Sequence, residues 1–381
     1  MIVVESPRHS RCFCPMECVV PYSPEELEDR ALIDESTGTP VPFQTERAEG
    51  GSRIFWILDS MAARQKRIYN LAQAPEQPSF SGVVVGPEDN AKLPVTVGRD
   101  HFTTYHFHRA LPRPFLHPVV GPFGAGVTRD YPMNDSEADS VDHPHHRSIW
   151  MGWGDVAGTD LWSEGEGSGR VVHSCFERYH SGPVFGRIAA LHSWEDADGN
   201  ELMQDRTEYR FYNLPCSMRM FDVHVTLYPA HDQVFLNDTT KGGVICVRMA
   251  TALGANHGGR IENAVGQLNE AEVWGQRAAW CDYSGQAGGQ WMGLAVLDHP
   301  SNFRYPTYWN ARDYGLITAN PLGLSEFLAS DRADGSVVLP EGDSLRFRYR
   351  IYVHAGDASD AEVHRKYVDW VNPPLARAER S

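Results

Sequence analysis

Residues 344–354, SLRFRYRIYVH, alternate apolar and polar side chains without interruption. A two-residue period places successive side chains on opposite faces of a β-strand, so this segment predicts a strand with one buried face. The polar face carries Arg346, Arg348 and Arg350 and ends at His354. We expect that face to meet solvent, an acidic layer or a cleft.

Segments of similar character recur along the chain from residue 82 onward. The clearest are residues 220–229, 243–253 and 291–300. Only residues 357–371 have the pattern of a helix, with Asp357 or Ser359 as the N-cap. Because strands do not alternate with helices, we predict an all-β fold: a large antiparallel β-sandwich with one C-terminal helix.

The length of 381 residues leaves room for more than one folded unit. Turn-punctuated strand patterns predict a small β-rich unit at residues 1–75. Residues 72–80 are rich in Pro and Gln and lack periodicity, which is typical of a linker. Residues 80–373 then form the sandwich that carries the candidate site.

The charge pattern excludes several classes of partner. The chain has 50 acidic and 34 basic residues, a net charge of −16, and no basic stripe that could neutralise phosphates. We therefore expect neither a nucleic acid nor an anionic membrane as partner. No apolar run approaches the roughly 18 residues that cross a bilayer. Without a recognisable signal peptide we predict a cytoplasmic location, and the preference for Arg over Lys favours a bacterial source.

The densest cluster of titratable side chains is DHPHHR at residues 142–147. It contains Asp142, His143, His145, His146 and Arg147. Pro144 prevents a regular helix, so the segment is extended or turning. Imidazoles suit acid–base chemistry near neutral pH or metal binding, although a hydrogen-bonded structural cluster is an alternative. In an extended chain, His143 and His145 share one face and His146 takes the other.

We assign candidate roles from this cluster. His143 and His145 are the predicted acid–base pair, Asp142 orients a ring N–H, and His146 is a further catalytic candidate. The candidate substrate-binding residues are Arg147, Trp162, Trp309, Arg312, Asp298, His299 and Lys241. Aromatic faces beside polar groups are typical of sugar sites, because C–H faces stack and hydroxyls take hydrogen bonds.

A second segment, residues 297–323, is rich in aromatic and charged side chains. It contains the same Asp-His-Pro triplet as residues 142–144, and long loops of this kind usually carry function. Arg312 could hold a carboxylate or two hydroxyls bidentately. The alternative for this arginine is a salt bridge to Asp313 or Asp282.

Metal binding is a second interpretation of the same residues. His143, His145, His299 and Asp298 could surround Zn, Fe or Mn, and a set of two His and one carboxylate would permit oxygen chemistry. Three thiols near the N-terminus are also spaced as metal ligands can be; these are Cys12, Cys14 and Cys18. Because no second ligand cluster follows at finger spacing, we interpret them as ordinary thiols. We predict no specific cofactor, with a divalent metal as the alternative.

Four long motifs resemble a family of bacterial proteins labelled PmoA-like, over roughly residues 80–370. They are RDYPM with DHPHHRSIWMGWGDVAGTDLW, GQRAAWCDYSG, DHPSNFRYPTYWNARDYG and RFRYRIYVHAGD. The resemblance implies a galactose-mutarotase-like super-sandwich, which works on a sugar ring with His and carboxylate groups. The family label suggests a membrane copper protein, which a chain without a membrane span does not fit.

The combined interpretation is an enzyme of carbohydrate or glycoside metabolism. It would act on a sugar-like small molecule by proton transfer, in hydrolysis, elimination or epimerisation. The alternatives are a metal-dependent hydrolase or oxygenase, a tailoring enzyme of secondary metabolism, and a non-catalytic sugar-binding module. Assembly into a homo-oligomer is left open by the sequence.

Overall fold

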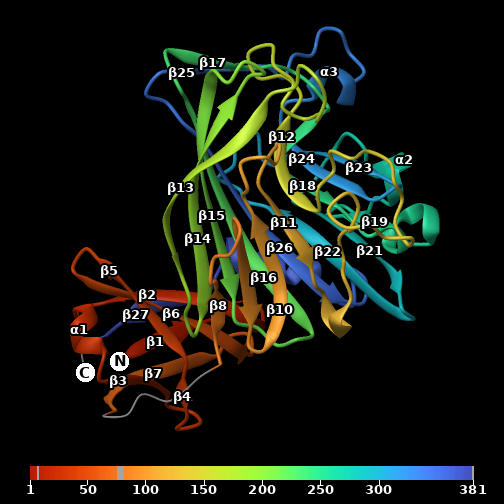
Figure 1. Ribbon diagram of the computed structural model, residues 1–381. Coiled ribbons are helices and arrows are strands. Elements are labelled where there is room, and N and C mark those ends of the chain that lie inside the picture. The colour runs from red at the N-terminus through yellow and green to blue at the C-terminus, as the bar shows by residue number, and fades with distance from the viewer. Residues whose placement is uncertain (7, 75–80, 380–381) are drawn as a thin grey trace.

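Two large antiparallel sheets face each other and enclose the main core (Figure 1). This computed structural model describes residues 1–6, 8–74 and 81–379. The predicted antiparallel β-sandwich is confirmed. Residues 75–80, most of the predicted linker, lie outside the described residues.

The first large sheet has nine strands. In spatial order they are β20 (Gln276–Arg277), β23 (Tyr308–Arg312), β24 (Leu316–Asn320), β18 (Gly242–Arg248), β12 (Ile149–Trp153), β11 (Phe115–Val119), β10 (Asp100–His106), β9 (Lys92–Val97) and β8 (Val83–Val85). Neighbours far apart in sequence meet at its centre, where β12 pairs with β18 and β18 with β24. This centre is where the candidate site is built.

The second large sheet has eight strands. In spatial order they are β13 (Arg170–His180), β14 (Phe185–Glu195), β15 (Glu201–Tyr212), β16 (Met218–Pro229), β26 (Leu345–Ala355), β22 (Gln290–Asp298), β21 (Trp280–Ala287) and β19 (Arg260–Asn263). The buried face predicted for residues 344–354 is confirmed, because Phe347, Tyr349 and Ile351 of β26 are buried in the core. The polar face is exposed at Arg346 and Arg348 but buried at Arg350, Tyr352 and His354.

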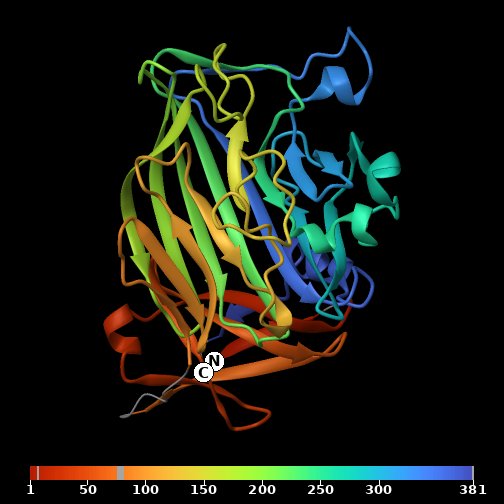
Figure 2. The same ribbon diagram turned by 45° about the vertical axis from the view of Figure 1, so that its right-hand side comes forward.

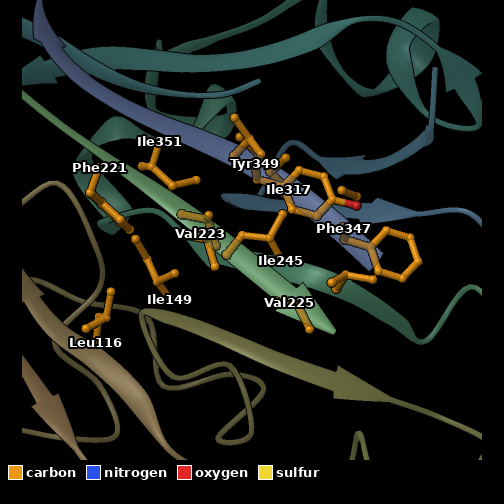
Figure 3. Packing of buried hydrophobic residues seen from close by; sticks show 14 of the residues in the cluster. Leu116, Ile149, Phe221, Val223, Val225, Ile245, Ile317, Phe347, Tyr349 and Ile351 are labelled. Atoms are coloured by element: carbon orange, nitrogen blue, oxygen red, sulfur yellow. The ribbon is translucent and has the colours of Figure 1, made fainter. Parts of the chain in front are cut away.

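Apolar side chains from the facing sheets interlock between them. Figure 3 shows Leu116, Ile149 and Ile317 of the nine-stranded sheet close to Val223 and Ile351 of the eight-stranded sheet. All five are at most 1% exposed, so the apolar face of each strand is removed from water. This burial leaves the opposite faces of both sheets free to carry polar groups.

Smaller sheets lie across one end of the sandwich (Figure 1 and Figure 2). One has five strands: β27 (Leu375–Ala378), β1 (Ile2–Glu5), β7 (Lys66–Gln73), β3 (Arg30–Asp34) and β4 (Pro40–Val41). Another has three: β2 (Arg11–Val20), β6 (Gly51–Met61) and β5 (Phe43–Ala48). A two-stranded ribbon of β17 (Gln233–Leu236) and β25 (Val337–Pro340) lies at the opposite end of the sandwich (Figure 1). Because β27 pairs with β1, the C-terminal strand completes the N-terminal sheet. The division at residues 75–80 stays a prediction.

The helices are short. They are α1 (Pro24–Leu27), α2 (Asn269–Val273), α3 (Leu324–Phe327) and α4 (Val363–Val371), with 3-10 turns at Pro122–Gly124, Thr251–Leu253 and Ala255–His257. The predicted C-terminal helix exists but begins late, after Glu362, and the predicted caps Asp357 and Ser359 are wrong. The Asp357 carboxylate instead accepts the N–H groups of Ser359 and Asp360, which closes a turn ahead of the helix. Within the described ranges, no helix is long and apolar enough to cross a membrane.

Candidate functional site

Strand pairing in the nine-stranded sheet sorts its residues into an inner and an outer row. The inner row, all in the main core, is Leu116, Ile149, Val247, Ile317 and Ala311. The neighbouring outer row is Phe115, Trp150, Cys246, Thr318 and Asn310. Because side chains alternate across a sheet, this outer row faces away from the core and forms the base of the candidate site.

A cavity of about 320 Å³ lies over this outer face. Residues from both segments singled out in the sequence line it, together with residues that the sequence did not indicate. The lining residues are His143, His145, His146, Trp162, Ser163, Thr240, Lys241, Trp274, Asn310, Arg312, Tyr314, Leu316 and Glu326. The volume is at the lower end of the range for small-molecule pockets.

The histidines meet because their segment turns. The N–H of His146 donates to the carbonyl of His143 at 3.0 Å, closing a tight turn around Pro144 and His145. The segment turns rather than extends, so His146 does not lie on the opposite face from His143 and His145, as an extended chain would require. His143 stacks on His146 with ring centroids 4.7 Å apart, and His145 meets His146 edge-on at 4.5 Å.

Aromatic rings continue the stack on both sides. Tyr314 stacks on the free face of His143 at 5.0 Å, and Trp150 stacks on His146 at 5.3 Å. Trp162 packs edge-on against His145 and His146. The cluster is thus a layered wall that joins the loop at 142–147 to the β23–β24 hairpin.

Two buried arginines hold the turn in place. Arg129 donates to the carbonyls of Ser140, Asp142 and His143, and its guanidinium also pairs with the Asp142 carboxylate. Arg248 of β18 binds the same carboxylate at 2.6 Å. Partial burial raises the pKa of Asp142, but Arg248 and Arg129 outweigh burial, so the net pKa lies below the usual range. Asp142 therefore stays ionised and anchors the loop.

The three imidazoles have different environments. His146 is buried, and its Nδ1 accepts from Arg248 Nη1 at 3.2 Å, which assigns the ring proton to Nε2. Burial, with the nearby His145 and Arg248, holds the pKa of His146 well below its usual range. His146 therefore remains neutral at physiological pH.

His145 is the least engaged of the three rings. Among the described residues, no hydrogen-bond partner of its ring nitrogens is found, although the side chain lines the cavity. Partial burial, with the positive charge of Arg113, lowers the pKa of His145 to about 4. At neutral pH this ring is uncharged and can accept a proton.

His143 is tied to a carboxylate. Its Nδ1 lies 3.2 Å from Asp142 Oδ2. A carboxylate can only accept, so Nδ1 carries the proton and Nε2 is left for other contacts. The orienting role of Asp142 stays a prediction.

The opposite side of the cavity comes from β23, the start of β18, α2 and α3. Arg312 lines it and pairs with Glu270 at 3.2 Å, rather than with the predicted Asp313 or Asp282. Asn310 accepts from Trp274 Nε1 and donates to the carbonyl of Thr240. Lys241 contributes an exposed ammonium with no ion pair among the described residues.

Trp309 is not part of the cavity, which corrects its predicted role. Strand alternation on β23 turns this side chain inward, where it is 0% exposed and donates to the carbonyl of Ala278. Its neighbours Asn310 and Arg312 take the outer face instead.

Asp298 and His299 are also placed elsewhere. Asp298 ends β22 and is fully buried, accepting from Asn302 and from the N–H of Thr307. His299 packs edge-on against Trp370 of α4, with ring centroids 4.9 Å apart. Neither lines the cavity that contains His143 and Lys241, so the predicted second polar wall is corrected.

Arg147 is engaged by an internal partner. Its guanidinium forms a bidentate pair with Glu164, with both N–O distances at 2.7 Å, and it lies over Phe115. Both donors that would recognise a substrate are thus occupied, and Arg147 does not line the cavity.

The alternative metal site is not assembled. The set of His143, His145, His299 and Asp298 is split between the cavity and the α4 side of the molecule. Across the part of the chain that the structure describes, no group of three or more His, Cys, Asp or Glu side chains is arranged to hold a metal ion. The thiols of Cys12, Cys14 and Cys18 are free.

Several residues of the site were not indicated by the sequence. Trp274, Thr240 and Glu326 lie outside the two segments that the sequence singled out, and Asn310 lies in the second segment but had no predicted role. Arg248 carried a weak signal, because an arginine in an apolar strand needs an acidic partner when it is buried, whereas Arg129 lies outside the strands. Only the pairing of β12, β18, β24 and β23 brings these side chains together.

Residues 92–368 match the model of a family of unknown function, DUF6807. The chain belongs to this family. The resemblance to a PmoA-like family was therefore wrong, because the matching family model is that of DUF6807 and the comparisons show no PmoA-like family. A search of curated proteins gave no match.

Solved structures with related shape include two carbohydrate-related proteins. An alpha-mannosidase from Enterococcus faecalis V583 aligns with 100% of this chain at 9% identity and a TM-score of 0.46; the chain spans 46% of that protein. A GalM/aldose epimerase homologue from C. elegans aligns with 73% of this chain and 99% of its own, at 8% identity and a TM-score of 0.25. Both scores lie below 0.5, so neither similarity establishes an activity.

Proposed function

We propose that the protein is an enzyme that transfers protons on a sugar-like small molecule bound in the cavity at residues 142–147. The observation that carries this proposal is the meeting of two unlike imidazoles in one cavity. His145 has no hydrogen-bond partner among the described residues and stays neutral, whereas His143 is oriented by Asp142. Groups whose environments differ in this way suit the two ends of a proton transfer.

Within this mechanism His145 acts as the base. Its pKa of about 4 keeps the ring neutral at physiological pH, which leaves a nitrogen lone pair for a substrate proton and makes the ring a weak base. The ring centroids of His143 and His145 are 5.8 Å apart. His143, with Nδ1 beside Asp142, exchanges the second proton through Nε2. Lys241 and Arg312 place positive charge at the same cavity, where it would stabilise negative charge developing on a substrate oxygen.

The lining favours epimerisation or elimination over hydrolysis of a glycoside. Glycosidases usually place two carboxylates on either side of the scissile bond. Among the described residues that line this cavity, Glu326 is the one carboxylate, and Thr240 already donates to it. Two imidazoles and a single carboxylate suit abstraction and return of a proton.

A sugar-like substrate fits the remaining walls. The rings of Trp162, Trp274 and Tyr314 offer faces and edges for C–H groups, while Arg312 and Ser163 offer hydrogen bonds to hydroxyls. The volume of about 320 Å³ accommodates a single small molecule rather than an oligosaccharide.

The test uses a panel of aldoses, keto-sugars and uronic acids incubated with the protein in D2O and followed by proton NMR. We expect one member to lose a carbon-bound proton signal or to form a new product. His145→Asn should slow that reaction about 10²- to 10⁴-fold, the usual contribution of a general base. His257→Asn is the matched control, because His257 is exposed and outside the cavity.

Two results would count against the proposal. Equal rates for His145→Asn and the native protein would remove His145 from the chemistry. Saturable sugar binding without turnover, kept in His145→Asn, would instead identify a sugar-binding module.

A further inference from the structure

A second cavity, of about 220 Å³, lies where the N-terminal unit meets the sandwich. Its walls come from β2 and β6, from the outer face of β15, β16 and β26, and from α4 with the segment after it. It shares no lining residue with the candidate site. The polar face of β26, left unassigned by the sequence, forms part of its wall.

Cross-strand pairing between β16 and β26 leaves one uncompensated positive charge on the wall of this cavity. Arg348 is directly opposite His224, and Arg350 is directly opposite Asp222. Arg350 and Asp222 form a bidentate pair at 2.6 and 2.9 Å, which neutralises both. The exposed guanidinium of Arg348 has no acidic partner among the described residues, so its charge is uncompensated.

Buried N–H groups on the wall also lack acceptors. Arg210 Nε is buried without a hydrogen-bond partner, and so is His224 Nε2, which donates in the tautomer that has its proton there. A buried donor without an acceptor is costly, so a bound molecule that supplies oxygens would be favoured here. Asp369 adds one buried oxygen, Oδ2, that is also unpartnered, and this oxygen needs a donor.

Other acids near this cavity are already engaged. Asp369 Oδ1 accepts from Arg11 at 2.9 Å, and Glu17 pairs with Arg53 on the surface. The Arg210 guanidinium reaches Glu208 through Nη2 only, at 3.3 Å, leaving Nε for another acceptor. The wall therefore offers a surplus of donors and one positive charge.

We propose that this cavity binds a small molecule that carries an oxyanion, a carboxylate or a phosphate, together with a hydroxyl. The oxyanion meets Arg348, Arg210 and His224, because guanidinium groups recognise planar or tetrahedral oxyanions through paired N–H donors. The hydroxyl donates to Asp369 Oδ2. The volume of about 220 Å³ is below the usual range for drug-sized ligands, which sets the ligand at a few carbon atoms.

Isothermal titration calorimetry with lactate and with inorganic phosphate tests this site and separates the two oxyanion classes. We expect saturable binding of at least one probe by the full-length protein. Arg348→Gln should weaken it about tenfold or more, as expected for loss of a charge-assisted hydrogen bond. Arg348 is exposed, so this variant should fold normally, which its melting temperature checks.

Arg346→Gln is the matched control, because Arg346 is on the same strand and face, is equally exposed, and does not line the cavity. Unchanged binding by Arg346→Gln and by His145→Asn would support the site. The proposal is overturned if neither probe binds saturably, if Arg346→Gln weakens binding as much as Arg348→Gln, or if His145→Asn abolishes binding.

Discussion

The chain contains the triplet Asp-His-Pro twice, at residues 142–144 and 298–300, and the fold gives the two copies opposite environments. The side chain of Asp142 is 40% exposed and is bound by Arg129 and Arg248. Asp298 is 0% exposed and is held by an amide and a backbone N–H, with no ion pair among the described residues.

The two histidines differ in the same way. His143 lines the candidate cavity and stacks between Tyr314 and His146. His299 packs against Trp370, and its Nδ1 accepts from the backbone N–H of Ser301 within its own turn. An identical triplet therefore lines the candidate cavity in one place and packs against α4 in the other, because neighbours from distant strands decide its surroundings.

The largest effect on stability is expected from Arg129→Met, which removes one of the two arginines that bind Asp142 of the first triplet. This change leaves the Asp142 carboxylate with one arginine and several loop carbonyls without their buried donor. We expect the free energy of unfolding to fall by about 3 kcal/mol or more, measured by urea denaturation. Arg109→Met is the control, because Arg109 is exposed. A similar loss of stability in this variant would contradict the role of Arg129 in holding the loop.

Substituting the histidines of the two triplets should have different effects on kcat. His143→Gln should lower kcat for the substrate found in the NMR screen about 10²-fold or more, because it removes one partner in proton transfer. His299→Gln should leave kcat unchanged, because His299 does not line the cavity. Steady-state kinetics on both variants checks this, and equal effects would contradict the assignment of the site.

The free energy of unfolding should fall as pH rises because of Asp298 in the second triplet, opposite to the dependence expected from Asp142 in the first. Burial raises the pKa of Asp298 to about 7, whereas an unfolded aspartate titrates near 3.9. The folded state therefore holds the proton more tightly, and stability is full below about pH 4 and is lost as pH rises through about 7.

The measurement is the difference in urea midpoint between the native protein and Asp298→Asn from pH 4.5 to 8. The difference curve isolates this group from the histidines that titrate in the same range. We expect the native protein to lose stability relative to the variant as pH rises. A flat difference curve would contradict the raised pKa of Asp298.

The smallest effect is expected at Asp142. Its pKa is lowered, since Arg248 and Arg129 outweigh the effect of partial burial, so its stabilising contribution is present above about pH 4 and lost in acid. Solvent exposure limits the contribution to less than about 1 kcal/mol. Asp142→Asn should flatten the acid side of the stability curve only, as followed by thermal melts between pH 3 and 6. A change confined to pH 6–8 would contradict this.

Part of the candidate site could be predicted from the sequence. The density of imidazoles at residues 142–147 predicted a polar cluster, and Trp162, Lys241 and Arg312 do line the same cavity. Trp309 was misassigned because an aromatic side chain next to polar residues carries no sign of which strand face it takes. Trp274 and Glu326 were missed because they reach the cavity from α2 and α3, far along the chain.

By itself, the sequence determined the all-β class and the position of the main strands. Alternation is a local property: residues 344–354 must bury one face whatever lies opposite, and β26 forms there. The tertiary structure decided which polar faces became cavities. Strand order in the nine-stranded sheet puts β18 between β12 and β24, and this non-local pairing places the first Asp-His-Pro triplet at a cavity. The second triplet begins at the end of β22 in the eight-stranded sheet, where Asp298 is buried.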